Sequence, residues 1–107
     1  MDERTYHELI SRSFRAIEDA LETVVPDVVE TSNTGDALTL TFKSGVRCVL
    51  NTQRPVRQLW MAARDTAWHV SWDEGQSAWL DDRGRGLELR ATLAGVIKQQ
   101  SDLDVAI

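Results

Sequence analysis

The segment from Leu38 to Leu50 constrains the fold of this 107-residue chain more than any other part of it. Its first half, Leu38-Thr39-Leu40-Thr41-Phe42, alternates strictly between apolar and polar residues, which is typical of a strand with one buried face. Lys43-Ser44-Gly45 follows as a turn, and a three-residue loop with Gly45 in the left-handed conformation favours a hairpin. The facing pairs are then all apolar: Phe42/Val46, Leu40/Cys48 and Leu38/Leu50. Other parts of the chain must cover this face.

The two ends of the chain carry apolar residues at helical spacing and can provide that cover. We expect one helix from about residue 3 to 24, with Asp2 as N-cap and Pro26 as its stop, and another from about 87 to 100. Each helix offers one apolar stripe. The predicted fold class is therefore α+β: a two-layer α/β sandwich with both terminal helices on one face of an antiparallel sheet of five or six strands. Residues 1–107 form a single domain.

Further strands are expected over residues 57–62, 68–72 and 78–80. The alternation in the first of these turns Gln58 and Trp60 away from the helices. In the second it turns Trp68 and Trp72 toward the core, while Trp79 in the third is expected to be half-buried. Only Trp60 among the four tryptophans falls on the side that the helices leave in contact with water, and an exposed aromatic ring calls for a partner.

The net charge of −5 is concentrated at one end of the chain. Residues 1–36 contain nine acidic residues against three arginines, a balance of −6, and the remainder is close to neutral. This distribution argues against nucleic acid as a partner and favours cations or a basic protein surface. The single cysteine, Cys48, excludes an internal disulfide and suits a reducing compartment, and we find no signal peptide or membrane span. We expect a cytoplasmic protein.

An acidic cluster lies on the polar side of the first expected helix. Helical spacing brings Glu18 and Asp19 close to Glu22, and such a cluster of oxygen ligands suits a hard cation such as Fe²⁺. Glu3 and His7, four residues apart, form a weaker carboxylate–imidazole candidate, and His7 is also a candidate haem ligand. The alternative is a solvated helix face on which Arg15 pairs with Asp19.

Catalytic residues are hard to find in this sequence. There is no nucleophile elbow, phosphate loop, Cys/His pair or closed metal-ligand spacing, and Cys48 is expected to point into the core. We therefore predict no catalytic residues and a protein that is not an enzyme. The alternatives are a ferroxidase that oxidises Fe²⁺ on the carboxylates of Glu18, Asp19 and Glu22, and an interaction domain without a physiological iron role.

The chain resembles the frataxin family, in its short form of the bacterial CyaY type. The resemblance rests on Ala37–Phe42, on the pattern Asn51-x-Gln53-x-Pro55-x-x-Gln58-x-Trp60-Met61-Ala62, and on matches in the first helix at Tyr6-His7, Ile17-Glu18-Asp19 and Leu21-Glu22. Asp82-Arg83 precedes the last helix as in bacterial members. The resemblance implies an iron-binding accessory and regulatory protein of iron–sulfur cluster assembly that can deliver Fe²⁺. It further implies a cytoplasmic monomer, with iron-driven oligomerisation as an alternative.

The resemblance also implies two functional surfaces. An acidic ridge on the first helix and first strand edge would bind iron or another divalent cation weakly and dock on a cysteine desulfurase. The exposed sheet face, with Asn51, Gln53, Gln58 and Trp60, would contact the cluster scaffold. This chain departs from the family pattern after the helix, where the ridge continues only through Asp27 and Glu30, so we expect reduced iron capacity. The metal candidates are thus Glu18, Asp19, Glu22, Asp27 and Glu30.

Overall fold

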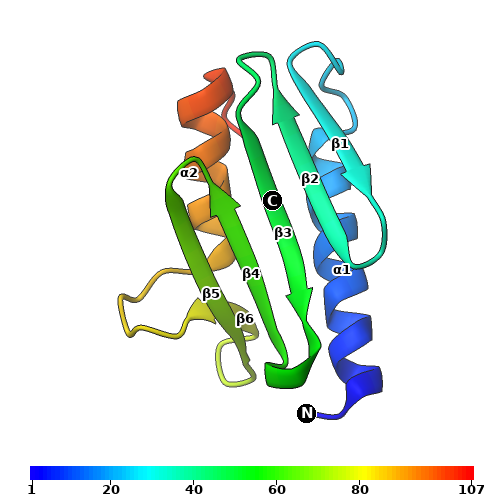
Figure 1. The fold of residues 1–107 in the computed structure, drawn as a ribbon, viewed down its shortest axis with the longest axis vertical. Helices are drawn as coiled ribbons and strands as arrows, with labels where there is room; N and C mark the ends of the chain where they lie inside the picture. The colour runs from blue at the N-terminus through cyan, green and yellow to red at the C-terminus, as the bar shows by residue number, and fades with distance from the viewer.

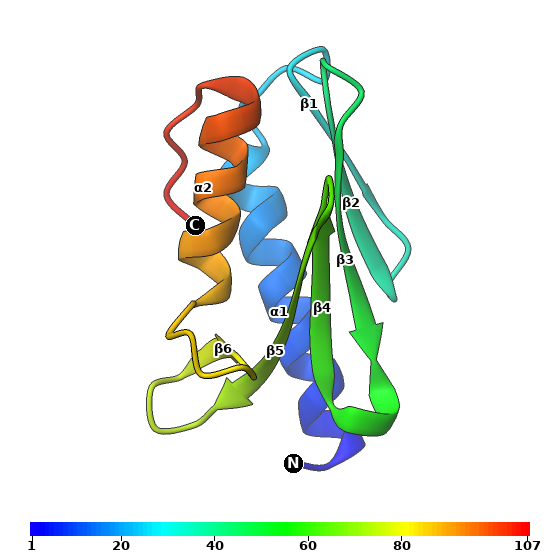
Figure 2. The same cartoon turned by 60° about the vertical axis from the view of Figure 1, so that its left-hand side comes forward.

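The structure is a computed structural model that describes all residues, 1–107. The chain folds into two layers, a sheet and a pair of helices (Figure 1). Its elements are α1 (Glu3–Leu21), β1 (Val29–Asn33), β2 (Ala37–Phe42), β3 (Arg47–Gln53), the 3₁₀ turn η1 (Arg54–Val56), β4 (Gln58–Ala63), β5 (Thr66–Asp73), β6 (Ala78–Asp81) and α2 (Leu89–Ser101). Figure 2 shows both helices on one side of the sheet and nothing on the other. The predicted α+β sandwich with terminal helices is confirmed.

The sheet is an antiparallel meander with the strand order β1-β2-β3-β4-β5-β6, so every strand pairs with the next one in sequence (Figure 1). The predicted hairpin register between β2 and β3 is present, with Leu38 opposite Leu50 and Leu40 opposite Cys48. Gly45 takes the left-handed conformation at φ +90° and donates its N–H to the Phe42 carbonyl at 2.8 Å. Alternation and turn chemistry together thus determined the register.

The first strand, β1, was not recognised in the sequence. Of its five residues only Val29 is buried, and the remaining four, Glu30 to Asn33, are exposed and polar. β1 lies at the edge of the sheet next to β2 and close to α1 (Figure 1). A short polar edge strand carries almost no alternation signal, and its structure comes from pairing with β2.

Both helices are shorter at one end than expected. α1 ends at Leu21 rather than near residue 24, because β-branched residues follow and Val25 precedes Pro26, a position that disfavours helix. α2 begins at Leu89 rather than Leu87, because Glu88 acts as N-cap and accepts the N–H groups of Arg90 and Ala91. Asp2 caps α1 as predicted, accepting the N–H of Thr5 at 2.7 Å.

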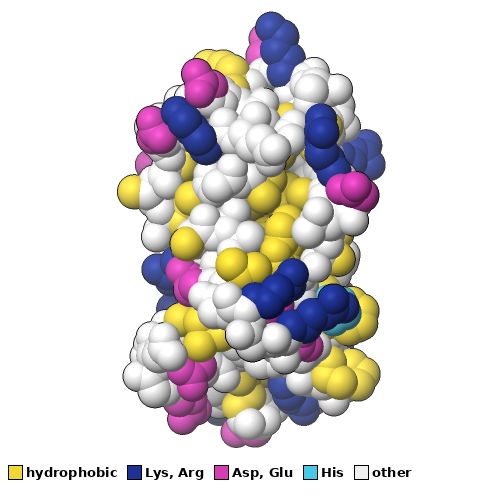
Figure 3. Space-filling view, turned by 90° about the vertical axis from the view of Figure 1, so that its left-hand side faces the viewer, with side chains coloured by type: hydrophobic (Ala, Val, Ile, Leu, Met, Phe, Trp, Pro, Cys, Tyr) yellow, Lys and Arg dark blue, Asp and Glu magenta, His cyan; other side chains and the backbone are white.

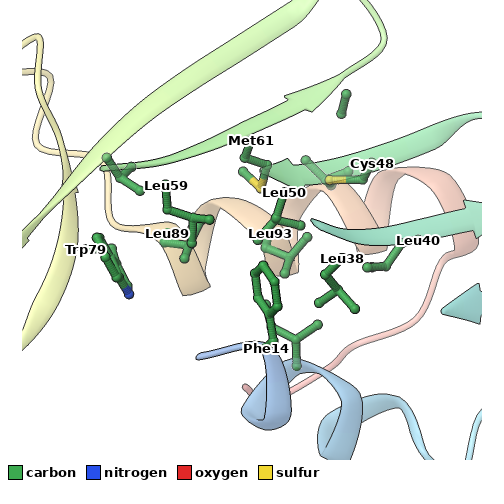
Figure 4. Close-up of a cluster of buried hydrophobic side chains, with 14 of the residues drawn as sticks. Phe14, Leu38, Leu40, Cys48, Leu50, Leu59, Met61, Trp79, Leu89 and Leu93 are labelled. Carbon is green, nitrogen blue, oxygen red and sulfur yellow. The ribbon is translucent and has the colours of Figure 1, made fainter. Parts of the chain in front are cut away.

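The core lies between the sheet and the two helices and contains 21 buried apolar residues. Figure 4 shows Phe14 of α1 and Leu93 of α2 pointing toward Leu38 and Leu50 of the sheet. The segment after α2 completes this layer, because the side chains of Leu103, Val105 and Ile107 pack against the core.

Burial of the tryptophans differs from the prediction. Trp79 is only 3% exposed and belongs to the core, where its indole N–H donates to Ser13 Oγ at 2.9 Å. Trp68 and Trp72, which were expected in the core, are half-buried. The alternation placed these rings on the correct face of the sheet. It could not show that β5 lies near the edge, where less of the helical layer covers it.

Candidate functional site

The four predicted partner-binding residues form one compact group on the open face of the sheet. β3 and β4 pair so that Asn51 lies opposite Trp60 and Gln53 lies opposite Gln58. Because alternate residues of neighbouring strands share a face, these side chains lie on the same side as one another and away from the helices. We refer to Asn51, Gln53, Gln58 and Trp60 as the sheet-face group.

Trp60 is held in place by two contacts rather than left free. Its ring stacks on His69, with centroids 4.0 Å apart and planes 9° from parallel. Its indole N–H donates to Gln58 Oε1 at 2.8 Å. The ring is therefore half-buried, although it lies on the face without helices. The outward direction of Trp60 was predicted, whereas its stacking on His69 depends on the register between β4 and β5.

Gln58 connects Trp60 to the following strand and loop. The Gln58 Nε2 group donates to Ser71 Oγ at 3.1 Å and to Asp82 Oδ2 at 3.0 Å. The side-chain amide thus uses its oxygen toward Trp60 and its nitrogen toward β5 and the segment after β6. Ser71 and Asp82 were not identified as site residues, because they are distant from Gln58 in sequence and only the sheet register brings them close.

Beneath the sheet-face group, Tyr6 of α1 joins the ends of β3 and β4. Its hydroxyl accepts the N–H of Gln53 at 3.0 Å and donates to the Gln58 carbonyl at 2.6 Å. The ring is fully buried, and burial raises the pKa of the phenol. The Arg57 guanidinium lies 5.7 Å from the centre of the ring. The helical spacing of Tyr6 indicates a buried apolar position on α1, but it does not indicate the two hydrogen bonds of its hydroxyl.

The loop after β6 is fixed by the carboxylate of Asp81. Its two oxygens accept from the Arg85 side chain at 2.9 and 2.8 Å, and Oδ2 also accepts the N–H groups of Arg83 and Arg85. The Asp81 side chain is fully buried. The Arg85 guanidinium is the largest cause that lowers the pKa of Asp81, to about 2, and the backbone N–H groups contribute to it. These bonds therefore hold the backbone on both sides of Asp82 in place.

Glu18, Asp19 and Glu22 lie at the C-terminal end of α1, with Glu22 as its C-cap, close to β1. Glu18 accepts a hydrogen bond from Asn33 Nδ2 at 2.9 Å and is half-buried, while Asp19 and Glu22 are exposed. Ion pairs on this helix join Arg4 to Glu8 and His7 to Glu3, and Arg15 forms none with Asp19. The ridge carboxylates are therefore free of basic partners.

The remaining metal candidates are not gathered around these three residues. Asp27 is exposed in the connection between α1 and β1. Glu30 pairs with Thr41 in the sheet register, on the opposite face from buried Val29, so it points to the open side of the sheet. His7 Nε2 lies 3.7 Å from Glu3 Oε1 at the other end of α1. The chain contains no group of three or more His, Cys, Asp or Glu side chains placed to hold one metal ion.

The structure offers no enclosed reaction centre. Cys48 is completely buried, and burial raises the pKa of its thiol to about 12, so it is not a nucleophile at neutral pH.

The hollows on the surface are shallow. One lies between α2 and the outer edge of β5, where Trp68 and Gly95 line it, and Figure 3 views this side with hydrophobic side chains exposed along it. No helix is long and apolar enough to cross a membrane.

These features define a class of protein: a small α+β domain whose distinctive chemistry lies on open surfaces. The comparisons with known proteins identify the family within this class. The family model described as the Frataxin-like domain matches residues 1–103. The iron-sulfur cluster assembly protein CyaY of Tolumonas auensis is 33% identical over 107 residues, covering 100% of this chain and 99% of the relative. Its counterpart from Stutzerimonas stutzeri is 35% identical over 100 residues, covering 94% of this chain and 89% of the relative. The chain belongs to the frataxin family.

Solved structures agree with this assignment. Frataxin from Psychromonas ingrahamii has a TM-score of 0.88 and 28% identity, covering 98% of this chain and 96% of that chain. The trimeric frataxin of the yeast Saccharomyces cerevisiae, complexed with ferrous iron, has a TM-score of 0.64 and 20% identity, covering 94% of this chain and 85% of that chain. The second likeness concerns the fold alone.

Proposed function

We propose that this chain is an accessory protein of iron–sulfur cluster assembly that acts mainly by docking on other proteins. Its relatives with about one third identical residues are named as iron-sulfur cluster assembly proteins. The observation that carries the proposal is the sheet-face group, in which a tryptophan and three amides share the open face. It supplies hydrogen-bonding groups around one large ring of tryptophan, a residue type that is enriched in interface cores and among hot spots.

The sheet-face group is the surface for the cluster scaffold. Trp60 is already immobilised by His69 and Gln58, so little side-chain freedom remains to be lost when a partner binds. Asn51 is exposed and directly opposite Trp60, where its amide is free to pair with partner backbone. A rigid aromatic ring beside a free amide supports binding of a protein surface better than capture of a small molecule.

Substitution of Trp60 tests this role. We expect Trp60→Ala to weaken binding to the organism's own scaffold by about thirtyfold, as for an interface hot spot of about 2 kcal/mol. Trp68→Ala is the matched control, because Trp68 is also half-buried but lies on the side that faces the helices. Calorimetric titration measures both affinities, and urea unfolding shows that both variants are folded. An unchanged affinity in Trp60→Ala would refute the scaffold surface.

The exposed carboxylates of α1 are the surface for a cysteine desulfurase with a basic patch. Asp19 and Glu22 are exposed and Glu18 is half-buried, and none of them forms an ion pair within the chain. Such unpaired charge accelerates association with an oppositely charged surface, and the effect falls with salt. The partner's chemistry is inferred from the family and from this charge.

Charge reversal distinguishes a local surface from net charge. We expect lysine at Glu18, Asp19 and Glu22 to abolish desulfurase binding at about 0.1 M salt, where the screening length is about 10 Å. Lysine at Asp65, Asp73 and Glu74 changes the net charge equally at a different place and is the control. Equal losses in both triple variants would show that net charge, rather than the acidic helix, governs docking.

Iron binding on the same helix is proposed as weak and shared with water ligands. No three carboxylates converge, so a cation is held by one or two oxygens and keeps most of its hydration shell. An anaerobic Fe²⁺ titration followed by NMR should perturb Glu18, Asp19 and Glu22 first, with smaller effects at Asp27 and Glu30. Perturbation of Glu3 and His7 alone would move the site to the other end of α1.

A ferroxidase role has less support from the geometry. Carboxylate ferroxidases enclose two irons within a helical bundle, whereas these carboxylates lie on an open surface without a convergent set. Oxygen consumption with stoichiometric Fe²⁺ checks this directly. A rate above that of the triple lysine variant at Glu18, Asp19 and Glu22 would favour the ferroxidase over the docking protein.

A further inference from the structure

We propose that Asp82 is a positioning residue, which fixes the orientation of the Trp60 ring through the side-chain amide of Gln58. Asp82 lies directly after β6 and forms no hydrogen bond with Trp60 itself. Its carboxylate accepts from Gln58 Nε2 at 3.0 Å, and Gln58 Oε1 in turn accepts from the Trp60 indole N–H at 2.8 Å. The inference concerns the geometry of Trp60, and it rests on the proposed function only for its effect on scaffold binding.

The direction of the Gln58 amide follows from the chemistry of its neighbours. An ionised carboxylate only accepts hydrogen bonds, so the group that faces Asp82 must be the amide nitrogen. The amide oxygen is thereby turned toward Trp60, whose indole N–H only donates. The reversed amide would set two donors against each other at Trp60 and two acceptors against each other at Asp82.

Ser71 does not determine the direction of the Gln58 amide. Its hydroxyl lies 3.1 Å from Gln58 Nε2, but a hydroxyl both donates and accepts, so it is compatible with either direction of the amide. Asp82 is therefore the only neighbour, besides Trp60 itself, that distinguishes the two orientations. Without the carboxylate, the amide can turn over and pair with Ser71 through its oxygen, which leaves the indole N–H without its acceptor.

Asp82 also supports the stack from the backbone side. Its N–H donates to the His69 carbonyl at 2.9 Å, which continues the pairing of β5 and β6 by one residue. The His69 ring lies flat against Trp60. Contacts therefore run in a closed ring from Asp82 to Gln58, Trp60, His69 and back to Asp82. One residue controls both the edge of the indole and the strand that carries its stacking partner.

The position of Asp82 is also fixed by contacts outside this ring. The preceding residue, Asp81, is buried and bound to the side chain and backbone of Arg85 and to the backbone of Arg83. These bonds fix the chain on either side of Asp82. The anchored loop thus acts as the fixed point, and the amide of Gln58 and the ring of Trp60 take their positions from it.

NMR of the indole N–H groups tests the inference in the full chain without a partner. In Asp82→Ala we expect the Trp60 indole resonance, identified by its loss in Trp60→Phe, to move upfield. Its exchange with water should be about fivefold faster, as expected for loss of a hydrogen bond of ordinary strength. The other three indole resonances and the Asp65→Ala control should stay unchanged. An unmoved Trp60 resonance with unchanged exchange would overturn the proposal.

A compensating pair of substitutions separates positioning from a general structural role. Gln58→Glu alone sets two carboxylates against each other at Asp82 and should displace Trp60. Combined with Asp82→Asn, the new glutamate accepts from both the asparagine amide and the indole N–H, so the Trp60 resonance should return toward its original position. A double variant no closer to the original than Gln58→Glu would contradict the proposal, because loss of structure at either position could not be rescued in this way.

Scaffold affinity then distinguishes this inference from the function on which it rests. If Asp82→Ala shifts Trp60 and weakens scaffold binding by about fivefold, both hold. If Trp60 shifts while binding of every Trp60 variant is unchanged, Asp82 positions the ring but the scaffold surface is wrong. If Trp60→Ala weakens binding while Asp82→Ala alters neither the resonance nor the affinity, the scaffold surface holds and the positioning role is wrong.

Discussion

Trp60 and His69 lie directly opposite each other on β4 and β5, and their rings are stacked 9° from parallel with 4.0 Å between centroids. Paired aromatic rings on one face of a sheet contribute about 0.2–1 kcal/mol beyond an alanine pair. The His69 ring covers one face of the indole, so in the proposed scaffold contact only the other face is available to a partner.

Removal of the Tyr6 hydroxyl should destabilise the protein without changing its packing. In Tyr6→Phe the N–H of Gln53 loses its acceptor and the Gln58 carbonyl loses a donor, next to a fully buried ring. We expect the free energy of unfolding to fall by about 1–3 kcal/mol, the cost of leaving such groups unpaired. Urea unfolding measures this. A change below about 0.5 kcal/mol would mean that water replaces the hydroxyl at both positions.

Acid unfolding should depend on Asp81. Its pKa in the folded protein, about 2, lies below the ordinary value of 3.8, so the folded state binds this proton less tightly than the unfolded state. The resulting stabilisation is complete above the ordinary pKa and is lost as the pH falls from there toward about 2. Unfolding free energy measured through this range should decline less steeply in Asp81→Asn than in the original protein. Asp65→Asn should retain the original slope, and parallel curves for Asp81→Asn would contradict the assignment.

Gly95→Ala should stabilise the protein. Gly95 lies inside α2 with ordinary helical backbone, and a Cβ added there meets no atom within 4 Å. Alanine in a helix interior is favoured over glycine by about 0.5–1 kcal/mol, so the melting temperature should rise. Gly45→Ala is the opposite control, because Gly45 has φ +90° and alanine there is strained. Destabilisation by Gly95→Ala would contradict the open space that surrounds the position of the added Cβ.

Two of the three tryptophans whose burial differed from the prediction, Trp79 and Trp68, should respond differently to truncation. Trp79→Phe loses a buried ring system and the bond from its indole N–H to Ser13, so we expect a loss of about 1–3 kcal/mol. Trp68→Phe leaves a half-buried position and should lose less than about 1 kcal/mol. Urea unfolding of the two variants side by side measures the difference. Equal losses would contradict their placement.

Cys48 should be inert in the folded protein. Its thiol is completely buried, and burial alone raises its pKa to about 12, so almost no thiolate is present at pH ~8. We expect a disulfide reagent such as DTNB to label Cys48 only at the rate of unfolding, and immediately in strong denaturant. Rapid labelling without denaturant would show that the β2–β3 hairpin opens locally.

The parts of the fold that the sequence predicted are those with local causes. The β2–β3 hairpin follows from alternation and from Gly45, and the start of α1 follows from the Asp2 cap. The polar strand β1 lacked such a signal, since it is defined by its neighbour rather than by its own residues. The burial of Trp79 depends on contacts with Ser13 and Tyr6 of α1, and no short window of the sequence contains that information.

The candidate site divides in the same way. The faces of Asn51, Gln53, Gln58 and Trp60 could be predicted, because a period of two assigns every side chain to one side of the sheet. The residues that hold them come from three separate parts of the chain: Tyr6 from α1, His69 and Ser71 from β5, and Asp82 from the loop after β6. Their contacts depend on strand order and on the end of α1 that meets η1, which follow from the completed fold. The grouping of Glu30 with the acidic helix stays a prediction, although its side chain points to the open face.

The meander order of the sheet also bears on how the chain reaches its native state. Every strand pairs with its sequence neighbour, so the sheet can form one hairpin at a time through short loops. Such local pairing favours rapid folding. α1 is the exception. It leaves the ribosome first, while the strands that bury its stripe, including Leu38, Leu50 and Leu59, follow much later. During synthesis the nascent chain therefore carries an apolar helix face that stays without a partner until the hairpins form.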